Sequence, residues 1–203
     1  LLDLADEMKR RRAAGERPAA GSPLAGRNVA LLFDKPSLRT RASFEVGTVW
    51  LGGHAVDLSG SGVGLGTRES VADVARVVDR LFDAVVVRTH AHRAIEEFAA
   101  WTDLPVVNAL TDDEHPCQAL ADLQTIRARF GRLDGVRLAF VGDGNNVFHS
   151  LALLGALAGM EVRLAHPEGY APRSEVVERA RSLAAGTGAR IVVGNDPRAA
   201  VAD

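Results

Sequence analysis

The chain has 203 residues, of which 47% are hydrophobic and 25% charged, as expected of a globular protein with a sizeable core. The formal net charge of −2 gives no indication of a nucleic-acid partner, and no segment approaches the roughly 18 apolar residues that a membrane span requires. The single cysteine, Cys117, excludes an internal disulfide framework and fits a reducing, cytoplasmic compartment.

Short β-branched apolar runs alternate with amphipathic helical patterns along the chain. Strands are predicted at residues 29–33, 54–58, 84–88, 105–108, 137–141, 161–165 and 190–193. Helices are predicted at residues 40–50, 69–81, 93–101, 117–130, 146–158 and 174–185. This rhythm is typical of βαβ units, so it predicts an α/β fold in which helices cover both faces of a parallel sheet.

A domain boundary is predicted between residues 130 and 136. Gly131 ends a helix, a polar connection follows, and a new strand opens a second α/β unit. We therefore expect one domain at residues 1–130 and a second at 131–203, with the helix from Cys117 bridging them. No element is predicted after residue 193. Ligands of open α/β sheets bind at the carboxyl ends of the strands, so functional residues should follow strands.

The stretch "LLFDKPSLRTRASFE" ends the first strand and begins a helix without a glycine-rich loop. The first backbone N–H groups of a helix lack intrahelical acceptors and favour anions, and the hydroxyls of Ser37 and Thr40 add to such a site. Arg39 can form two parallel hydrogen bonds with a phosphate or carboxylate. The alternative is that Ser37 only caps the helix while Arg39 and Arg41 are solvated. Taken alone, the stretch leaves both interpretations open.

Two further stretches place polar residues after strands. In "AVVVRTHAH" the third strand ends at Arg88, which is either a site residue or an ordinary surface arginine. In "NALTDDEHPCQALADLQTI" the aspartates before the helix are predicted to cap it. Pro116 fixes the start of that helix, so His115 and Gln118 are expected to project together toward the strand ends. Cys117 is predicted to be a buried thiol and not a nucleophile, and no residue cluster indicates a metal site.

The stretch "LAFVGDGNNVFHS" has the first two glycines of a dinucleotide-binding turn, Gly142 and Gly144. Residues 145–147 lack the third glycine, so we reject nicotinamide binding and expect no cofactor. The amides of Asn145 and Asn146 either bind the polar end of a small substrate or cap the following helix.

Together and in this order, Ser-x-Arg-Thr-Arg, Arg-Thr, His-Pro-Cys-Gln-Ala-Leu-Ala-Asp and Gly-Asp-Gly-Asn-Asn resemble the aspartate/ornithine carbamoyltransferase family. The last motif is most similar to the ornithine-specific members. The resemblance implies an enzyme of arginine biosynthesis that transfers the carbamoyl group of carbamoyl phosphate to the side-chain amine of L-ornithine. It also implies a homotrimer or a multiple of trimers. The alternatives are a sibling transferase acting on putrescine or an acylated ornithine, a non-catalytic carbamoyl-phosphate-binding module, and a nicotinamide-dependent dehydrogenase.

The resemblance also assigns roles to individual residues, with the first domain binding carbamoyl phosphate and the incomplete second domain binding ornithine. The residues expected to hold carbamoyl phosphate are Ser37, Leu38, Arg39, Thr40, Arg88, His115 and Gln118. Arg39, Thr40, Arg88 and His115 are expected to be catalytic. Asn146 stands where the family binds the α-amino-acid part of ornithine, and Arg68 lies in a loop that family members pass to a neighbouring subunit's active site.

This chain departs from the family pattern at two positions. Leu38 stands where many members have threonine, which removes a hydroxyl but keeps the backbone N–H. Gly64 stands where some members have glutamine, so the neighbouring-subunit contact is expected to pass to Arg68. The family's Ser-Met-Gly and His-Cys-Leu-Pro motifs would fall after Asp203. Residues 1–203 by themselves are therefore expected to bind carbamoyl phosphate without converting ornithine.

Overall fold

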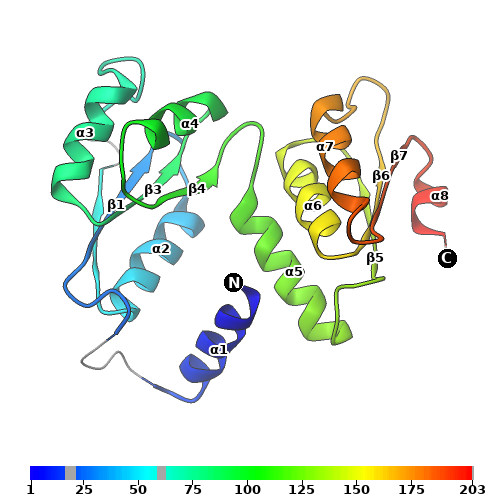
Figure 1. Cartoon of the computed structure of the whole chain (residues 1–203), viewed down its shortest axis with the longest axis horizontal. Helices are drawn as coiled ribbons and strands as arrows, with labels where there is room; N and C mark the ends of the chain where they lie inside the picture. The colour runs from blue at the N-terminus through cyan, green and yellow to red at the C-terminus, as the bar shows by residue number, and fades with distance from the viewer. Residues whose placement is uncertain (17–21, 59–62, 203) are drawn as a thin grey trace. The chain divides into compact units, whose positions relative to one another are not determined.

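The computed structural model describes residues 1–16, 22–58 and 63–202 (Figure 1). The chain folds into two compact units, Asp6–Asp112 on the one hand and Leu1–Ala5 with Asp113–Asp203 on the other. The predicted domain boundary between residues 130 and 136, with a different binding role on each side, stays a prediction. Among the described helices, none combines the length and the apolar character needed to cross a membrane.

The unit Asp6–Asp112 is built on a sheet of parallel strands in the order β2-β1-β3-β4. Its strands are β1 (Asn28–Phe33), β2 (His54–Asp57), β3 (Ala84–Arg88) and β4 (Val106–Leu110). Helix α1 (Leu2–Ala13) is shared between the two units. The other helices of this unit are α2 (Leu38–Trp50), α3 (Val71–Leu81) and α4 (His92–Ala100). The predicted parallel sheet is confirmed, with element ends within a few residues of the expected positions.

Strand β1 explains why helices cover both faces of this sheet. Ala30 and Leu32 pack into a core cluster with the apolar residues of α3 and α4. Leu31 and Phe33 point the other way and pack with Phe44 of α2. A strand that is buried on both faces reads as a continuous apolar run, as β1 does. Figure 1 shows α3 and α4 on one side of the strands and α2 on the other.

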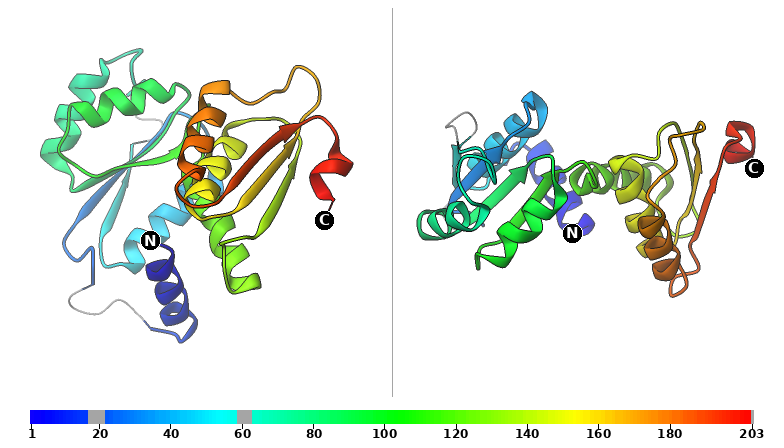
Figure 2. Two further views of the ribbon diagram at one scale, coloured as in Figure 1. Left: turned by 45° about the vertical axis from the view of Figure 1, so that its right-hand side comes forward. Right: turned by 90° about the horizontal axis from the view of Figure 1, so that it is seen from above.

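The unit that contains Asp113–Asp203 has a second parallel sheet, in the order β5-β6-β7. Its elements are α5 (Pro116–Phe130), β5 (Arg137–Val141), α6 (Asn146–Leu157), β6 (Glu161–Ala165), α7 (Ser174–Ala184), β7 (Arg190–Gly194) and α8 (Pro197–Val201). Helix α8 was not predicted. Asp196 caps it by accepting the N–H of Arg198 at 2.9 Å, and Pro197 begins it. Figure 2 shows α6 and α7 on one side of this sheet and α8 on the other.

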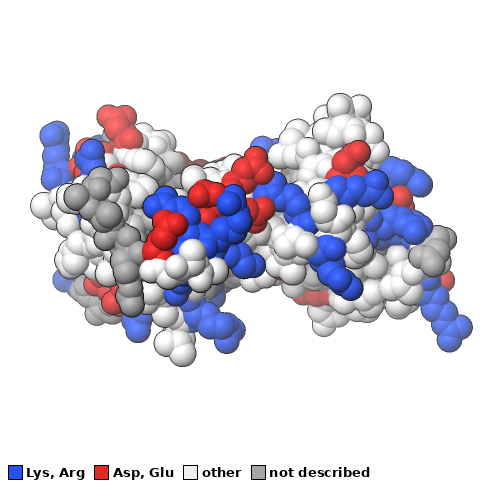
Figure 3. Space-filling model, turned by 90° about the horizontal axis from the view of Figure 1, so that it is seen from below, with Lys and Arg blue, Asp and Glu red and all other residues white. Residues whose placement is uncertain are grey.

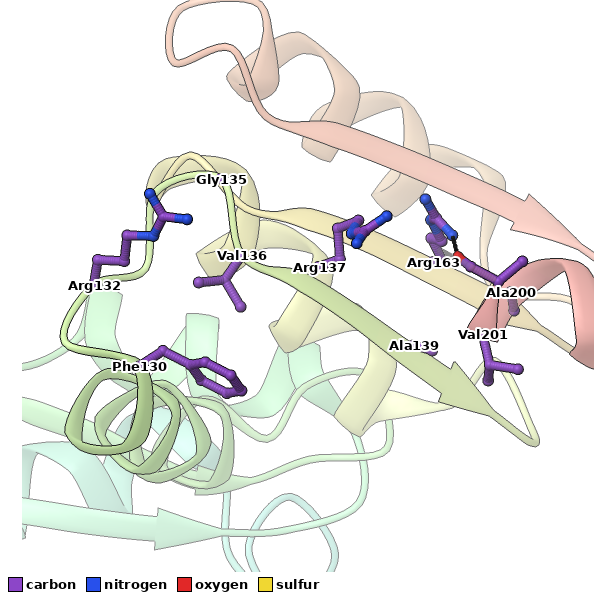
Figure 4. A pocket seen from close by; sticks show the side chains of 10 residues that line it. Phe130, Arg132, Gly135, Val136, Arg137, Ala139, Arg163, Ala200 and Val201 are labelled. Atoms are coloured by element: carbon purple, nitrogen blue, oxygen red, sulfur yellow. Dashed lines mark hydrogen bonds between the residues drawn. The ribbon is translucent and has the colours of Figure 1, made fainter.

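A pocket of about 430 Å³ lies on the α8 side of this second sheet (Figure 4). Arg137 and Arg163 line it from neighbouring strands, and Phe130 lines it from the end of α5. Arg163 is held by Glu161 at 2.7 Å and also donates to the carbonyl of Ala202. None of the site residues predicted from the sequence lines this pocket, so it is not the candidate active site.

One face of the molecule carries surface charges of both signs. On the face drawn in Figure 3, acidic side chains lie among the basic ones. This pattern agrees with the small net charge of the chain.

Candidate active site

The turn between β1 and α2 presents unpaired backbone donors. Ser37 has an extended backbone, with φ −160° and ψ 95°, and is the N-cap residue of α2. Its Oγ accepts the N–H of Thr40 at 3.4 Å, and its carbonyl accepts the N–H of Arg41 at 3.1 Å. The N–H groups of Leu38 and Arg39 have no intrahelical acceptor. Ser37 is therefore a cap, and two amides remain at the helix start for an anion.

The two arginines of this turn have different surroundings. Arg41 pairs with Asp57 at the carboxyl end of β2, with 3.0 Å between Nη1 and Oδ2. Arg39 is exposed, and its guanidinium forms no hydrogen bond or ion pair with the described residues. Arg41 thus has a structural partner, whereas Arg39 is available to a ligand.

The sheet register brings Arg88 to the same edge as this turn. Phe33 is paired with Arg88, and Arg88 in turn with Leu110, so β1, β3 and β4 end side by side. The N–H of Asp34 donates to the carbonyl of Arg88 at 2.9 Å. Arg88 Nε is buried and has no hydrogen-bond partner among the described residues. Burial lowers the pKa of the Arg88 guanidinium, which nevertheless stays charged. The Nε–H group of Arg88 is therefore a buried donor that lacks an acceptor among the described residues.

Side-chain contacts tie the three loops of this edge to one another. Thr89 donates to Asp34 Oδ2 at 2.9 Å, which joins the segments after β3 and β1. Asp112, after β4, forms an ion pair with Lys35 and lies 3.6 Å from His90 Nδ1. Sequence reasoning missed these contacts because their partners are far apart along the chain. The register of the strands is what brings them together.

The predicted capping role of the two aspartates before α5 is wrong. The N-cap residue of α5 is His115, and it makes no side-chain capping bond. Asp112 instead pairs with Lys35, and Asp113 pairs with Arg173. Both carboxylates hold a cation from another part of the chain, and neither aspartate is the N-cap residue of α5.

Replacing Asp112 by asparagine is expected to reduce stability at neutral pH by less than about 1 kcal/mol, because the Lys35 pair is partly exposed. The hydrogen bond from Lys35 lowers the pKa of Asp112. A lowered carboxyl pKa contributes stability that is present above the unfolded value, about 3.9, and is lost as the pH falls through the folded value. Urea midpoints of wild type and variant should therefore converge below about pH 4. A constant difference between pH 7 and pH 3 would contradict this assignment.

On the other unit, the start of α5 is anchored through its backbone. The N–H of His115 donates to Ser150 Oγ at 2.9 Å, which holds the start of α5 against α6. Gln118 is exposed and donates to Asp122 at 2.9 Å. Cys117 is half-buried and not fully buried as predicted, and its partial burial raises the pKa of the thiol, which fits the prediction that it is not a nucleophile.

The Gly-Asp-Gly-Asn-Asn segment forms the start of α6. Asn145 is the N-cap residue, and its Oδ1 accepts the N–H groups of Val147 and Phe148 at 3.0 and 3.4 Å. Its capping interpretation is thereby confirmed, and Asn146 remains as the candidate for ligand binding. A Cβ atom on Gly144 would lie 2.4 Å from Pro172 N. The glycine therefore has a packing reason, because Pro172 lies directly against it.

Gly144→Ala is expected to destabilise the fold by roughly 1–3 kcal/mol, because the added methyl meets backbone atoms that cannot rotate away. Gly47→Ala is the matched control, since nothing lies within 4 Å of its added methyl in α2. That variant is expected to be neutral or up to about 1 kcal/mol more stable. Urea denaturation compares them, and equal midpoints would exclude the packing explanation.

A depression of about 920 Å³ lies beside the carboxyl ends of β1 and β3. Its lining includes Asp34, Thr89 and His90, together with Gly64 and its neighbours. Arg68 is exposed in the same loop and does not line the depression. Within residues 1–16, 22–58 and 63–202, no three His, Cys, Asp or Glu side chains converge as metal ligands.

The predicted site residues fall into two sets. Ser37, Leu38, Arg39, Thr40 and Arg88 lie at one edge of the β2-β1-β3-β4 sheet. His115, Gln118 and Asn146 lie at the starts of α5 and α6 in the other unit. The first set offers cationic and amide donors for an anion, and the second offers an imidazole and neutral amides for polar groups.

Comparisons with known proteins match two domain families, which divide the chain after α5 and so place His115 and Gln118 with the first match. Residues 1–128 match the family "Aspartate/ornithine carbamoyltransferase, carbamoyl-P binding domain", and residues 134–203 match the corresponding "Asp/Orn binding domain". The chain is 50% identical to ornithine carbamoyltransferase of Anoxybacillus flavithermus over 203 residues, and 51% identical to that of Parafrankia sp. over 202. These matches cover 100% of the chain but only 64% and 63% of the relatives.

Solved structures agree with the sequence matches. Ornithine carbamoyltransferase from Pyrococcus furiosus superposes with a TM-score of 0.95 at 42% identity, covering 100% of this chain and 64% of that one. Aspartate transcarbamoylase from Trypanosoma cruzi superposes with a TM-score of 0.81 at 33% identity, covering 95% of this chain and 63% of that one. Since the first family match alone spans more than half of the chain, the chain belongs to the aspartate/ornithine carbamoyltransferase family.

Proposed function

We propose that the full-length polypeptide containing these residues transfers the carbamoyl group of carbamoyl phosphate to the side-chain amine of L-ornithine, giving citrulline and phosphate. The observation that carries this proposal is one edge of the β2-β1-β3-β4 sheet, where the first amides of α2, the exposed Arg39 and the half-buried Arg88 have no anionic partner among the described residues. The ornithine names of the relatives at about 50% identity support the choice of acceptor. Residues 1–130 would hold carbamoyl phosphate, and residues 131–203 would form part of the ornithine-binding domain.

The residues have distinct roles in the proposed reaction. The neutral amine attacks the carbonyl carbon, a C–N bond forms, and the C–O bond to phosphate breaks, with the departing phosphate taking the proton that the nitrogen loses. Ser37 and the amides at the start of α2 hold the phosphate, and Arg39 and Arg88 stabilise its departing charge. No protein nucleophile is required.

The carbonyl oxygen gains negative charge in the tetrahedral state. Donors from His115, Arg39 and Thr40 would stabilise it, and the loss of one such donor typically costs on the order of 3 kcal/mol. Gln118 would contact the carbamoyl nitrogen, and Asn146 the α-amino-acid part of ornithine. Leu38 offers only its amide, because its exposed side chain carries no hydroxyl. Activity should rise with pH until the ornithine side-chain amine is neutral.

The assembly is proposed to be a homotrimer or a multiple of trimers that acts in the cytoplasm. The exposed loop around Arg68 supports a contact with a neighbouring subunit, since its side chain does not line the depression of its own unit.

Citrulline formation by the purified full-length polypeptide tests the proposal. L-Ornithine should be a far better acceptor than putrescine, an acylated ornithine or aspartate, with carbamoyl phosphate as the donor. A preference for another amine would instead identify a sibling transferase. Tight binding of a phosphonate analogue of carbamoyl phosphate without turnover of any amine would identify a binding module. Residues 1–203 by themselves should bind that analogue at best and form no citrulline.

A further inference from the structure

One buried histidine near the proposed site has no role in the reaction described above. His149 lies in α6, three residues after Asn146, and only 3% of its surface is exposed. Nδ1 lies 2.8 Å from the carbonyl oxygen of Asp113, and Nε2 lies 3.1 Å from the backbone nitrogen of Arg173. Both ring nitrogens are therefore engaged by backbone atoms of segments distant along the chain.

These two contacts determine the protonation of His149. The backbone N–H of Arg173 can only donate, so Nε2 must accept and carry a lone pair. Nδ1 then carries the proton of the neutral ring and donates it to the carbonyl of Asp113. A protonated imidazole would present two N–H groups and lose the bond to Arg173. The observed arrangement requires the neutral ring.

The segments held by His149 adjoin the residues assigned to the substrates. Asp113 lies two residues before His115, and the next residue of α6, Ser150, accepts the N–H of His115 at 2.9 Å. The side chain of Arg173 returns to the carboxylate of Asp113, which closes a ring of contacts. Consecutive residues of α6 thus fix the backbone on which His115 is carried.

The segment that precedes α5 is irregular, so contacts with other elements hold it, among them the hydrogen bond from Asp112 N–H to the carbonyl of His90. Residues 111–115 form neither helix nor strand, and His115 begins α5 without a side-chain cap. The contacts from α6 therefore contribute directly to the position of the His115 backbone.

Resting on the proposed function, we infer that His149 is a positioning residue, which as a neutral imidazole aligns His115 with Asn146 by holding Asp113 and Arg173 against the start of α6. It touches neither substrate. Its effect on the reaction passes through His115 at the carbamoyl group and Asn146 at the ornithine end. The alternative is a purely structural histidine, whose loss would lower stability without a specific effect on turnover.

The experiment compares substitutions of His149 in the full-length polypeptide. His149→Phe keeps the ring volume and removes both hydrogen bonds, and kcat is expected to fall by about ten- to a hundredfold with the fold intact. His149→Asn can still donate to the carbonyl of Asp113 from its side-chain amide, so it should recover much of the loss. His54→Phe, at an exposed histidine of β2, is the control and should keep wild-type kcat.

Hydrogen exchange gives a readout that does not depend on turnover. Backbone amides of residues 112–116 and of Arg173 should exchange faster in His149→Phe, while those of β6 keep their protection. If wild type makes no citrulline, the proposed function fails, and unchanged exchange in the variant would independently overturn the positioning role. Wild-type kcat in a folded His149→Phe would also overturn it. If that variant does not fold, His149→Asn decides: the positioning role requires faster exchange of the Arg173 amide, which loses its acceptor, together with a kcat below that of wild type, and wild-type values for both would overturn it.

Discussion

Arg39→Ala is expected to lower kcat/KM for carbamoyl phosphate by about ten- to a hundredfold in the full-length polypeptide. The guanidinium is exposed at the start of α2 and has no partner among the described residues, so its donors are free for the departing phosphate. A hydrogen bond to a charged group is worth about 1.5–3 kcal/mol, and each 1.4 kcal/mol is a factor of about ten in rate. Steady-state citrulline formation measures the loss. The free energy of unfolding should hardly change, because no internal contact of the side chain is removed.

Arg41→Ala is the matched control for Arg39. The two arginines lie two residues apart in one helix and carry the same charge, but Arg41 is held by Asp57. A partly exposed ion pair contributes about 0–1 kcal/mol, so this variant should lose less than about tenfold in kcat/KM. Equal losses in both variants would show that only the summed positive charge matters, and the specific role of Arg39 would then be wrong.

The strands and helices could be predicted because the residues that indicate them are neighbours in the sequence. The residues of β1 are buried on both faces, and the resulting apolar run is visible without any knowledge of its neighbours. Ser37 and Asn145 also act where their residue types indicate, as caps at the starts of α2 and α6. Helix α8 was missed because five residues are too few to show a helical period, although Asp196 and Pro197 are typical starting residues.

Contacts between distant segments could not be predicted in the same way. Asp112 and Asp113 stand before a helix and have the residue type of caps, yet each binds a cation from elsewhere in the chain. The pair of Lys35 and Asp112 spans 77 residues and depends on the register of β1, β3 and β4. The same holds for His149, whose two partners become visible only once Asp113 and Arg173 are packed against α6. The types of residue along the chain were enough to predict the helices and strands. The partners of the polar side chains depend on how the strands are aligned and on how the helices pack, which the sequence does not show.

Arg88→Met is expected to abolish most activity while leaving the fold as stable as before or slightly more stable. Arg88 Nε is buried at the end of β3 without a partner among the described residues, and burial lowers the pKa of the guanidinium. An unpaired buried donor costs free energy in the folded protein, so an apolar chain of similar length removes that cost. The same change deletes donors that are proposed to hold the phosphate, so kcat/KM should fall by about ten- to a hundredfold.

Arg88→Lys separates charge from geometry at this position. Lysine keeps the positive charge but cannot form two parallel hydrogen bonds, so its kcat/KM should lie between those of wild type and Arg88→Met. Urea denaturation and binding of a phosphonate analogue of carbamoyl phosphate complete the comparison. A structural arginine would give the opposite pattern, with a large drop in the free energy of unfolding and unchanged analogue binding in Arg88→Met. A buried donor without a partner among the described residues, at the end of a central strand, is therefore best explained by the proposed phosphate ligand, because the fold alone gains nothing from it.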